Sequence, residues 1–407
     1  MRKKALVYGI CLLGTVCTLS AKDKKGGALY KDAKAPIEKR VDDLLSRMTL
    51  EEKVMQLNQY TLGRNNNVNN VGEEVKKVPA EIGSLIYFET NPELRNNMQK
   101  KAMEESRLGI PIIFGYDAIH GFRTVYPISL AQACSWNPDL VEQACAVSAQ
   151  EARMSGVDWT FSPMIDVARD PRWGRTPETY GEDPSLSGVL GVAFVKGLQG
   201  NHPRYLKTVS TPKHFAVNNE EHNRSSCNAK VSERDLREYY LPSFERCITE
   251  GKAQSIMMAY NAVNDVPCTV NTYLIKNVLR GDWGFNGYIV SDCSAPEWMI
   301  TKHHYVKTRE AAATLAVKAG LDLECGNQVY GEGLLKAYRQ YMVSEADIDS
   351  AAYRILRGRM MLGLFDAPSQ NPYNQIEPSV VGCKAHRDLA LEAARQSMVL
   401  LKNKDNF

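Results

Sequence analysis

The chain has 407 residues, of which 44% are hydrophobic, so it can form one large core and is too long for most single cores other than barrels. Its formal charge of +3 is small and evenly spread, with no basic stripe interleaved with aromatic residues. Neither a nucleic acid nor a membrane surface is therefore predicted as a partner, and we expect a small-molecule ligand.

The N-terminus is typical of a secretory signal. A basic start precedes the apolar run "ALVYGICLLGTVCTL", which ends at Ser20 and Ala21 before a polar segment. We predict a signal peptide over residues 1–21 and an exported protein, either periplasmic or secreted. A lipid anchor on Cys17 is the minor alternative, because the residues before it match a processing site poorly. No other segment is apolar for long enough to suggest a membrane span.

Ten cysteines occur in the sequence, two of them within the predicted signal. The other eight form no CxxC pair, so zinc and redox motifs are not indicated. Export would permit disulfides without indicating which residues pair, and buried thiols are the default interpretation.

Strands and helices are predicted to alternate after a helix that begins near Thr49, which has capping-box spacing with Glu52. Seven strand-like runs follow, "EIGSLIYF", "GIPIIFGYDA", "VDWTFSPMIDVA", "LKTVSTPKHFAVNN", "QSIMMAYNAVND", "GYIVSDC" and "GLDLECG", and an eighth strand is predicted near "QLNQYT". This spacing predicts an α/β fold, a (β/α)8 TIM-type barrel over residues 22–366. A doubly wound open sheet is the alternative, although no Gly-rich turn suits a dinucleotide.

The composition changes near the C-terminus. The Pro- and Asn-rich stretch "DAPSQNPYNQIEPSV" precedes a further helix and the apolar run "SMVLLKN". We interpret residues 367–407 as a linker and the beginning of a second α/β domain, of which this chain would contain only the opening helix and strand.

Polar and charged residues collect at the predicted C-terminal ends of the strands, where barrel enzymes build their sites. They are Asp117, Asp166, Arg169, Asp170, Arg172, Arg175, Lys213, His214, Tyr260, Asn261, Asp292 and Glu324. Taken alone, Asp292 would be interpreted as the cap of the helix that follows it. The convergence of so many polar groups favours a site residue instead.

Such side chains suit a neutral polyhydroxylated ligand, a sugar, which needs many oriented donors and acceptors beside aromatic faces. The sequence has no Gly-rich phosphate loop, no HExxH or GxSxG motif and no metal-spaced Asp/His cluster. Phosphate binding, zinc hydrolysis and serine-type acyl transfer are therefore not indicated. No metal and no cofactor is predicted.

Several runs resemble the family 3 glycoside hydrolases, the retaining β-glucosidase and β-xylosidase group. They include "VDDLLSRMTLEEKV", "GIPIIFGYDAIHG", "DPRWGRTPETYGEDP", "KHFAVNNEEHNR" and "WGFNGYIVSDC", and they follow in order over nearly the whole chain after the signal. The resemblance implies a catalytic barrel that acts on an oligosaccharide or β-glucoside.

The resemblance also implies roles for individual residues. Asp292 matches the nucleophile, which would form a covalent glycosyl-enzyme. The side chains that match sugar-binding groups are Asp117, Arg175, Lys213, His214 and Tyr260. For Arg175, a structural ion pair with Asp166 or Asp170 stays an alternative. Loop-shaping hydrogen bonds are expected of Glu178, Glu182 and Asp183, and an ion pair of Glu221 with Arg224.

A retaining mechanism needs a second carboxyl group as acid/base, about 5 Å from the nucleophile. In multi-domain members of the family this residue comes from the second domain, so we expect it outside this chain. One-domain members that act on N-acetylglucosamine carry a His/Asp pair on a loop after "KHFPGHG". The corresponding run here, "KHFAVNNEEHNRSS", lacks that pattern.

The identity of the sugar is indicated in two directions. Cys293, where many glucosidases carry Trp, and the run "GLDLECG" resemble the xylosidase branch, whereas Asp117, where xylosidases tend to carry Glu, resembles the glucosidases. We predict an exo-acting retaining β-glycosidase that releases glucose. The alternatives are a β-xylosidase of the same family, a one-domain hexosaminidase, and an inactive sugar-binding fragment.

Overall fold

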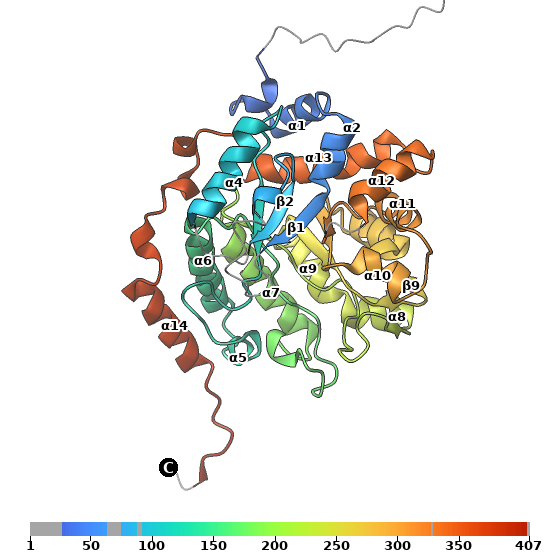
Figure 1. The fold of residues 1–407 in the computed structure, drawn as a ribbon. Helices are drawn as coiled ribbons and strands as arrows, with labels where there is room; N and C mark the ends of the chain where they lie inside the picture. Colours follow the sequence, from blue (N-terminus) through green and yellow to red (C-terminus); the bar gives the residue numbers. More distant parts are fainter. Residues whose placement is uncertain (1–26, 63–74, 88–91, 327–328, 405–407) are drawn as a thin grey trace, which may run out of the picture.

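Eight parallel strands follow one another around a ring in the computed structural model, which describes residues 27–62, 75–87, 92–326 and 329–404 (Figure 1). They are β1 (Asn58–Leu62), β2 (Ser84–Tyr87), β3 (Ile113–Tyr116), β4 (Trp159–Thr160), β5 (Val209–Ser210), β7 (Ser255–Met258), β10 (Tyr288–Ser291) and β11 (Glu324–Cys325). Parallel pairing joins β11, β1, β2, β3, β4 and β5 in that order, and joins β7 to β10. Two parallel bridges, Phe215 with Met258 and Val290 with Leu323, cross the remaining gaps and close the ring. The predicted (β/α)8 architecture is confirmed.

The strands are short and buried. Every residue of β2, β7 and β10 is buried, as is typical of parallel strands that are covered on both faces. The predicted eighth strand is confirmed as β1, in which Asn58 pairs with Glu324 of β11 and Gln59 pairs with Ser84 of β2.

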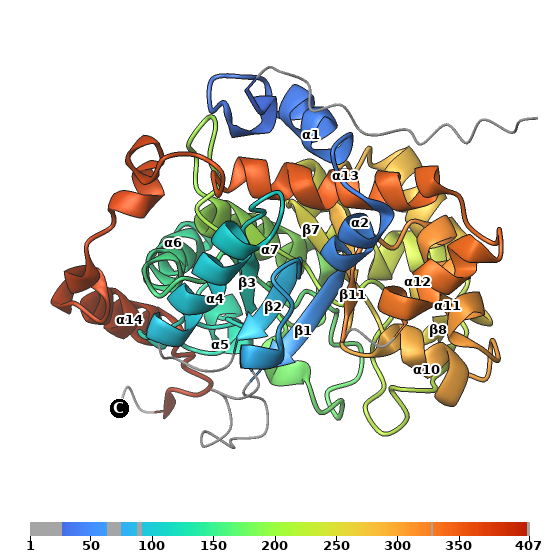
Figure 2. The ribbon, with the colours of Figure 1, turned by 45° about the horizontal axis from the view of Figure 1, so that its top comes forward.

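Helices surround the ring. They are α1 (Ile37–Leu45), α2 (Leu50–Gln56), α4 (Pro92–Glu105), α5 (Ser129–Ala133), α6 (Pro138–Met154), α7 (Pro184–Gln199), α9 (Pro242–Thr249), η6 (Tyr273–Asp282), α10 (Ala295–Thr301), α11 (Arg309–Ala319), α12 (Tyr330–Arg339) and α13 (Glu345–Met361). The helices α1 and α2, which precede the first strand, contact α13, which follows the last one (Figure 2). This contact holds the two ends of the barrel together.

The predicted capping box is confirmed. The Thr49 hydroxyl accepts a hydrogen bond from the Glu52 backbone N–H, and the Glu52 carboxylate accepts one from the Thr49 N–H at 2.8 Å. Two otherwise unpaired donors at the start of α2 are satisfied in this way.

Shorter elements lie between the main ones. Outside the ring, β6 (Asn228–Ala229), β8 (Ala262–Val263) and β9 (Val266–Pro267) form a small sheet. The short helical segments are η1 (Leu29–Lys31), η3 (Thr176–Glu178), α8 (Glu233–Asp235), η4 (Leu236–Tyr240), η5 (Cys268–Val270), η7 (Pro368–Gln370), η8 (Pro372–Gln375) and η9 (Pro378–Val380). Among the helices of the described ranges, none is both long and apolar enough to cross a membrane.

The C-terminal segment lies along the outside of the barrel. Its helix α14 (Lys384–Gln396) contacts α6 and α5 (Figure 1), and His386 Nδ1 lies 2.8 Å from the buried Glu151 carboxylate of α6. The strand predicted in "SMVLLKN" is absent from residues 398–403, where Leu401 is 92% exposed. A strand needs a neighbour for its backbone hydrogen bonds, and no described residues pair with this run. The predicted signal peptide lies outside the described residues.

Candidate active site

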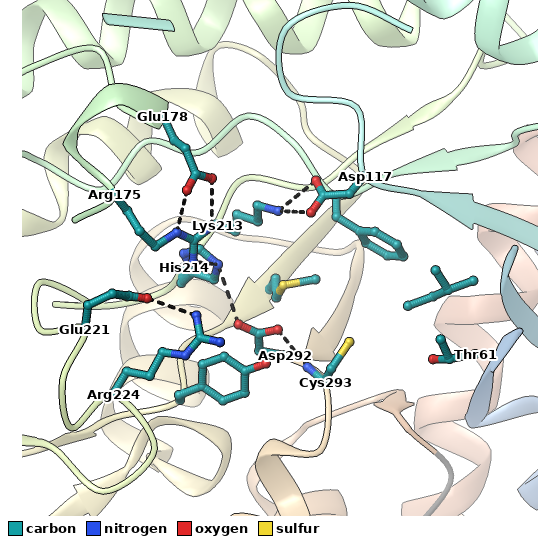
Figure 3. A pocket seen from close by; sticks show the side chains of 14 residues that line it. Thr61, Asp117, Arg175, Glu178, Lys213, His214, Glu221, Arg224, Asp292 and Cys293 are labelled. Carbon is teal, nitrogen blue, oxygen red and sulfur yellow. Dashed lines mark hydrogen bonds and ion pairs between the residues drawn. The ribbon is translucent and has the colours of Figure 1, made fainter. Parts of the chain in front are cut away.

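A cavity of about 420 Å³ lies at the C-terminal ends of the barrel strands (Figure 3), within the size range of small-molecule sites. It is lined by Thr61, Ile86, Asp117, Phe161, Arg175, Glu178, Lys213, His214, Glu221, Arg224, Met257, Tyr260, Asp292 and Cys293. All six residues that the sequence analysis singled out for nucleophilic attack or sugar binding are in this set. The cavity therefore brings them together, and their chemical roles stay predictions.

The strand ends explain the convergence. Asp117 directly follows β3, and Asp292 directly follows β10. Lys213 follows β5, where its backbone N–H donates to the Pro163 carbonyl at 2.9 Å. Because parallel strands end at the same rim of a barrel, residues far apart in the sequence meet there.

The Asp292 carboxylate lies inside the cavity. Its Oδ1 accepts a hydrogen bond from the Cys293 backbone N–H at 2.7 Å, and its Oδ2 lies 3.5 Å from His214 Nε2 (Figure 3). The interpretation of Asp292 as a helix cap is wrong, because α10 has Ser294 as its N-cap and no side chain caps it. The carboxylate is therefore available to a ligand, with its side chain 11% exposed.

Two opposing effects act on the charge of Asp292. Burial raises the pKa of this carboxyl group above its ordinary value, and the positive charge of Lys213 is the largest influence that lowers it. A hydrogen bond from Tyr260 also lowers it. The Tyr260 ring stacks on Trp298 at 4.3 Å between centroids, and the Arg224 guanidinium lies over the same ring, 5.2 Å from its centre.

Lys213 and Asp117 form an ion pair across the cavity wall. The Lys213 Nζ donates to both carboxylate oxygens of Asp117 at 2.9 Å (Figure 3). The Lys213 side chain is 3% exposed, whereas that of Asp117 is 43% exposed. The lysine thus orients a carboxylate whose outer side faces the open cavity.

Arg175 is held by Glu178. Its Nε and Nη2 donate to the two Glu178 carboxylate oxygens at 2.8 Å each, and its Nη1 lies 3.2 Å from His214 Nε2. Asp166 or Asp170 was the ion-pair partner expected from the sequence, and the structure corrects this to Glu178. Glu178 lies three residues after Arg175, in η3, and can form the bidentate geometry that a guanidinium favours.

The tautomer of His214 follows from its partners. A guanidinium can only donate, so the contact from Arg175 requires His214 Nε2 to accept. The proton then resides on Nδ1, which donates to Asp166 Oδ2 at 2.8 Å, so the Asn218 side-chain amide 3.2 Å from Nδ1 must turn its oxygen toward that N–H. The His214 backbone N–H donates to the same Asp166 oxygen at 2.9 Å. Burial, then the charges of Arg175 and Lys213, lowers the pKa of His214 well below its ordinary value, so the imidazole is neutral.

Asp166 was not identified from the sequence as the partner of His214. It is 3% exposed, and burial raises its pKa to about 8. A proton on its second oxygen leaves Oδ2 free to accept both His214 bonds, so either protonation state preserves the tautomer. Its position at the end of a predicted strand indicated that Asp166 lies near the site. Its pairing with His214 depends on how the chain bends after β5, which the sequence does not indicate.

The other polar residues mostly stabilise loops. Asp183 accepts backbone N–H bonds at the start of α7, and Glu324 accepts them at the start of α12. Glu221 and Arg224 form the expected pair at the cavity wall, with 2.9 Å between Oε1 and Nη1. Among the described residues, no group of three or more His, Cys, Asp or Glu side chains could hold a metal ion.

Known proteins resemble this chain along most of its length. Residues 49–358 match the model of the glycosyl hydrolase family 3 N terminal domain. The chain is 35% identical over 407 residues to a periplasmic β-glucosidase of Salmonella typhimurium, a match that covers 97% of this chain and 52% of that protein. It is 36% identical over 375 residues to a β-xylosidase of Formosa agariphila, with 86% and 51% covered.

Solved structures show the same fold. A β-glucosidase from Listeria innocua in complex with glucose has a TM-score of 0.82 and 35% identity, over 90% of this chain and 52% of that one. A β-glucosidase from Erythrobacter marinus has a TM-score of 0.84 and 31% identity, over 93% and 52%. The chain thus spans about half the length of these relatives. Because the family model matches well over half of its residues, the chain belongs to glycosyl hydrolase family 3, a family of glycoside hydrolases.

Proposed function

We propose that this protein is an exo-acting retaining β-glycosidase that releases a terminal β-linked glucose from oligosaccharides. The observation that carries the proposal is the Asp292 carboxylate, which faces a cavity of sugar-binding size and is surrounded by oriented donors and acceptors. Relatives named β-glucosidases, one of them crystallised with glucose, support this choice of sugar.

Asp292 acts as the nucleophile. One carboxylate oxygen attacks the anomeric carbon and forms a new C–O bond, while the glycosidic bond breaks and its oxygen takes a proton from a general acid. Water then attacks the same carbon, which releases the carboxylate, and gives its proton to the same group acting as base. The positive charge of Lys213 and the N–H of Cys293 favour the ionised form that attack requires.

The paired side chains bind one terminal sugar. Asp117 accepts hydrogen bonds from sugar hydroxyls on its open side while Lys213 fixes its other face. Arg175 and His214, which are linked to each other, present further polar atoms beside Asp292. This arrangement recognises the hydroxyls of a single unit, which is what exo action requires.

We place the acid/base outside the described residues. Besides Asp292 the cavity contains three carboxylates, and each is paired with a lysine or arginine. Although burial opposes the effect, hydrogen bonds from Arg175 hold the pKa of Glu178 below its ordinary value, which makes that group a poor acid. The relatives extend well beyond the matched half, which supports a second domain as the source.

The proposal includes export and the domain division predicted from the sequence. The signal peptide over residues 1–21 would direct the chain to the periplasm or the medium, and the named periplasmic relative supports this. The barrel would then occupy residues 22–366, with residues 367–407 leading into the second domain.

Hydrolysis of dinitrophenyl β-glucoside tests the proposal. This leaving group needs little acid assistance, so the barrel without its acid/base should release dinitrophenol. Azide, a nucleophile that needs no general base, should accelerate turnover and give β-glucosyl azide, because two inversions retain the configuration. Release of an α-configured product would contradict the proposal. Hydrolysis of an alkyl glucoside as fast as that of dinitrophenyl β-glucoside, with no acceleration by azide, would also contradict it. Faster hydrolysis of the xyloside than of the glucoside would favour the xylosidase alternative.

A further inference from the structure

Two cysteines meet beside the proposed nucleophile. The Sγ atoms of Cys293 and Cys325 are 2.8 Å apart, closer than two sulfur atoms in ordinary van der Waals contact. Cys293 lies two residues beyond β10, and Cys325 ends β11, the next strand in the ring. Backbone bonds fix this neighbourhood, because the Ser294 N–H donates to the Cys325 carbonyl at 2.8 Å.

The two thiols differ in access. Cys293 is half-buried and lines the sugar cavity, whereas Cys325 is fully buried behind it. The hydrogen bond shared with Cys293, together with burial, raises the pKa of the Cys325 thiol well above its ordinary value. A reagent that enters the cavity therefore reaches Cys293 before Cys325.

We propose that Cys293 and Cys325 form a disulfide that links β10 to β11 and positions Asp292. This inference rests on the proposed export and on the proposed role of Asp292. In an oxidising compartment, a disulfide-type oxidant supplies the chemistry. The Cys293 thiolate attacks one sulfur of the oxidant, which gives a mixed disulfide on Cys293 and releases the oxidant's other sulfur as a thiol. Cys325 then attacks Cys293 Sγ and releases the bound half of the oxidant as a second thiol. In total, the two protein thiols lose two protons and two electrons, and the oxidant becomes two thiols.

The bond would act on the site through the backbone. The Cys293 N–H donates to Asp292 Oδ1 at 2.7 Å, so movement of residue 293 moves the carboxylate. Cys293 and Cys325 are 32 residues apart, and the disulfide would close the loop that contains α10 and α11. Cys293 and Cys325 are thus positioning residues, which act on the reaction through Asp292.

Peptide mapping of the exported full chain tests the bond directly. The protein is denatured in iodoacetamide without reductant and digested with trypsin, which gives peptides 281–302 and 319–336, each with one cysteine and no internal Lys or Arg. We expect these two peptides to be recovered linked, and to separate after reduction. The exposed Cys134 serves as an internal control, since it should be alkylated in both samples. Recovery of both peptides singly alkylated would overturn the proposal.

A functional measurement separates positioning from mere stability. Reduction of the folded protein should lower kcat for dinitrophenyl β-glucoside by about tenfold with a smaller change in KM, and reoxidation should restore it. The double variant Cys293→Ala, Cys325→Ala should start at the lower rate and be insensitive to reductant, while Cys134→Ser should behave as wild type. A linked pair whose reduction leaves kcat unchanged would refute the positioning role. The mapping result is independent of turnover, so failure of the proposed activity would not be mistaken for failure of the disulfide.

Discussion

Replacing Lys213 with methionine should change both the binding of sugar and the charge of Asp292. Methionine keeps an unbranched chain of similar length and removes the ammonium group. The variant loses the two 2.9 Å bonds to Asp117 and the positive charge that most lowers the pKa of Asp292. Asp117 stays hydrated from the open cavity, because its side chain is 43% exposed, so we expect only a small loss of stability.

The kinetic effect has two parts. Loss of a charge-assisted hydrogen bond in a buried site costs about 1.5–3 kcal/mol, which lowers kcat/KM for dinitrophenyl β-glucoside by about 10- to 150-fold. The pKa of Asp292, already raised by burial, rises further once the Lys213 charge is gone. A smaller fraction of Asp292 is then ionised at a given acidic pH, so the acidic limb of the pH profile shifts to higher pH.

A matched control distinguishes this effect from the general cost of removing a buried lysine. Lys207 is also buried, burial lowers its pKa to about 8, and it does not line the cavity. Lys207→Met should leave the acidic limb in place. A Lys213→Met variant with reduced activity but an unshifted acidic limb, or with a loss confined to melting temperature, would show that the Lys213 charge does not control the ionisation of Asp292.

Three further predictions concern groups around the site and the fold. Burial raises the pKa of Asp166 from 3.8 to about 8 in the folded state, so this carboxyl group stabilises the fold less as pH rises between those values. Asp166→Asn keeps an acceptor for His214 and should flatten the fall in melting temperature between pH 5 and 8. An unchanged slope would contradict this prediction. Glu151→Gln weakens the acceptor of His386 and of the Gly382 backbone N–H just before α14, and should cost about 1–3 kcal/mol in urea unfolding. A loss below about 0.5 kcal/mol would show that these bonds are dispensable. Thr49→Ala removes half of a capping box and should lower the free energy of unfolding by about 1 kcal/mol. Thr49→Ser keeps the hydroxyl and should largely avoid this loss. Equal losses of stability in the two variants would show that the hydroxyl is not the cause.

The barrel could be predicted from local patterns. Runs such as Tyr288 to Ser291 are buried throughout and recur at the spacing of βα units, and the capping box of α2 is formed as predicted. The strand β1 was harder to identify, because Asn58 and Gln59 are polar. These residues form a strand because β2 and β11 provide backbone partners on both sides, and both side chains are fully buried there.

Membership of the cavity could be predicted, but pairing within it could not. Strand ends indicate which residues reach one rim, and the family resemblance selected six that line the cavity. The partner of Arg175 is Glu178, and Asp166 binds His214, because the loops after β4 and β5 decide which groups come within hydrogen-bond distance. The contact between Cys293 and Cys325 likewise depends on the closure of β10 onto β11.

The rest of the proposed function depends on Asp292 being a nucleophile in a folded retaining site. This role is tested most directly by incubating the exported chain with a 2-deoxy-2-fluoro-glucoside that carries an activated leaving group, followed by intact mass measurement and peptide mapping. We expect one stable adduct on the peptide of residues 281–302, assigned to Asp292 and absent in Asp292→Asn. The adduct should persist in Asp170→Asn, because the Asp170 carboxylate is exposed and lies outside the cavity. A folded chain that gains no adduct from either the glucose or the xylose reagent, or that gains one on another residue, would contradict this role.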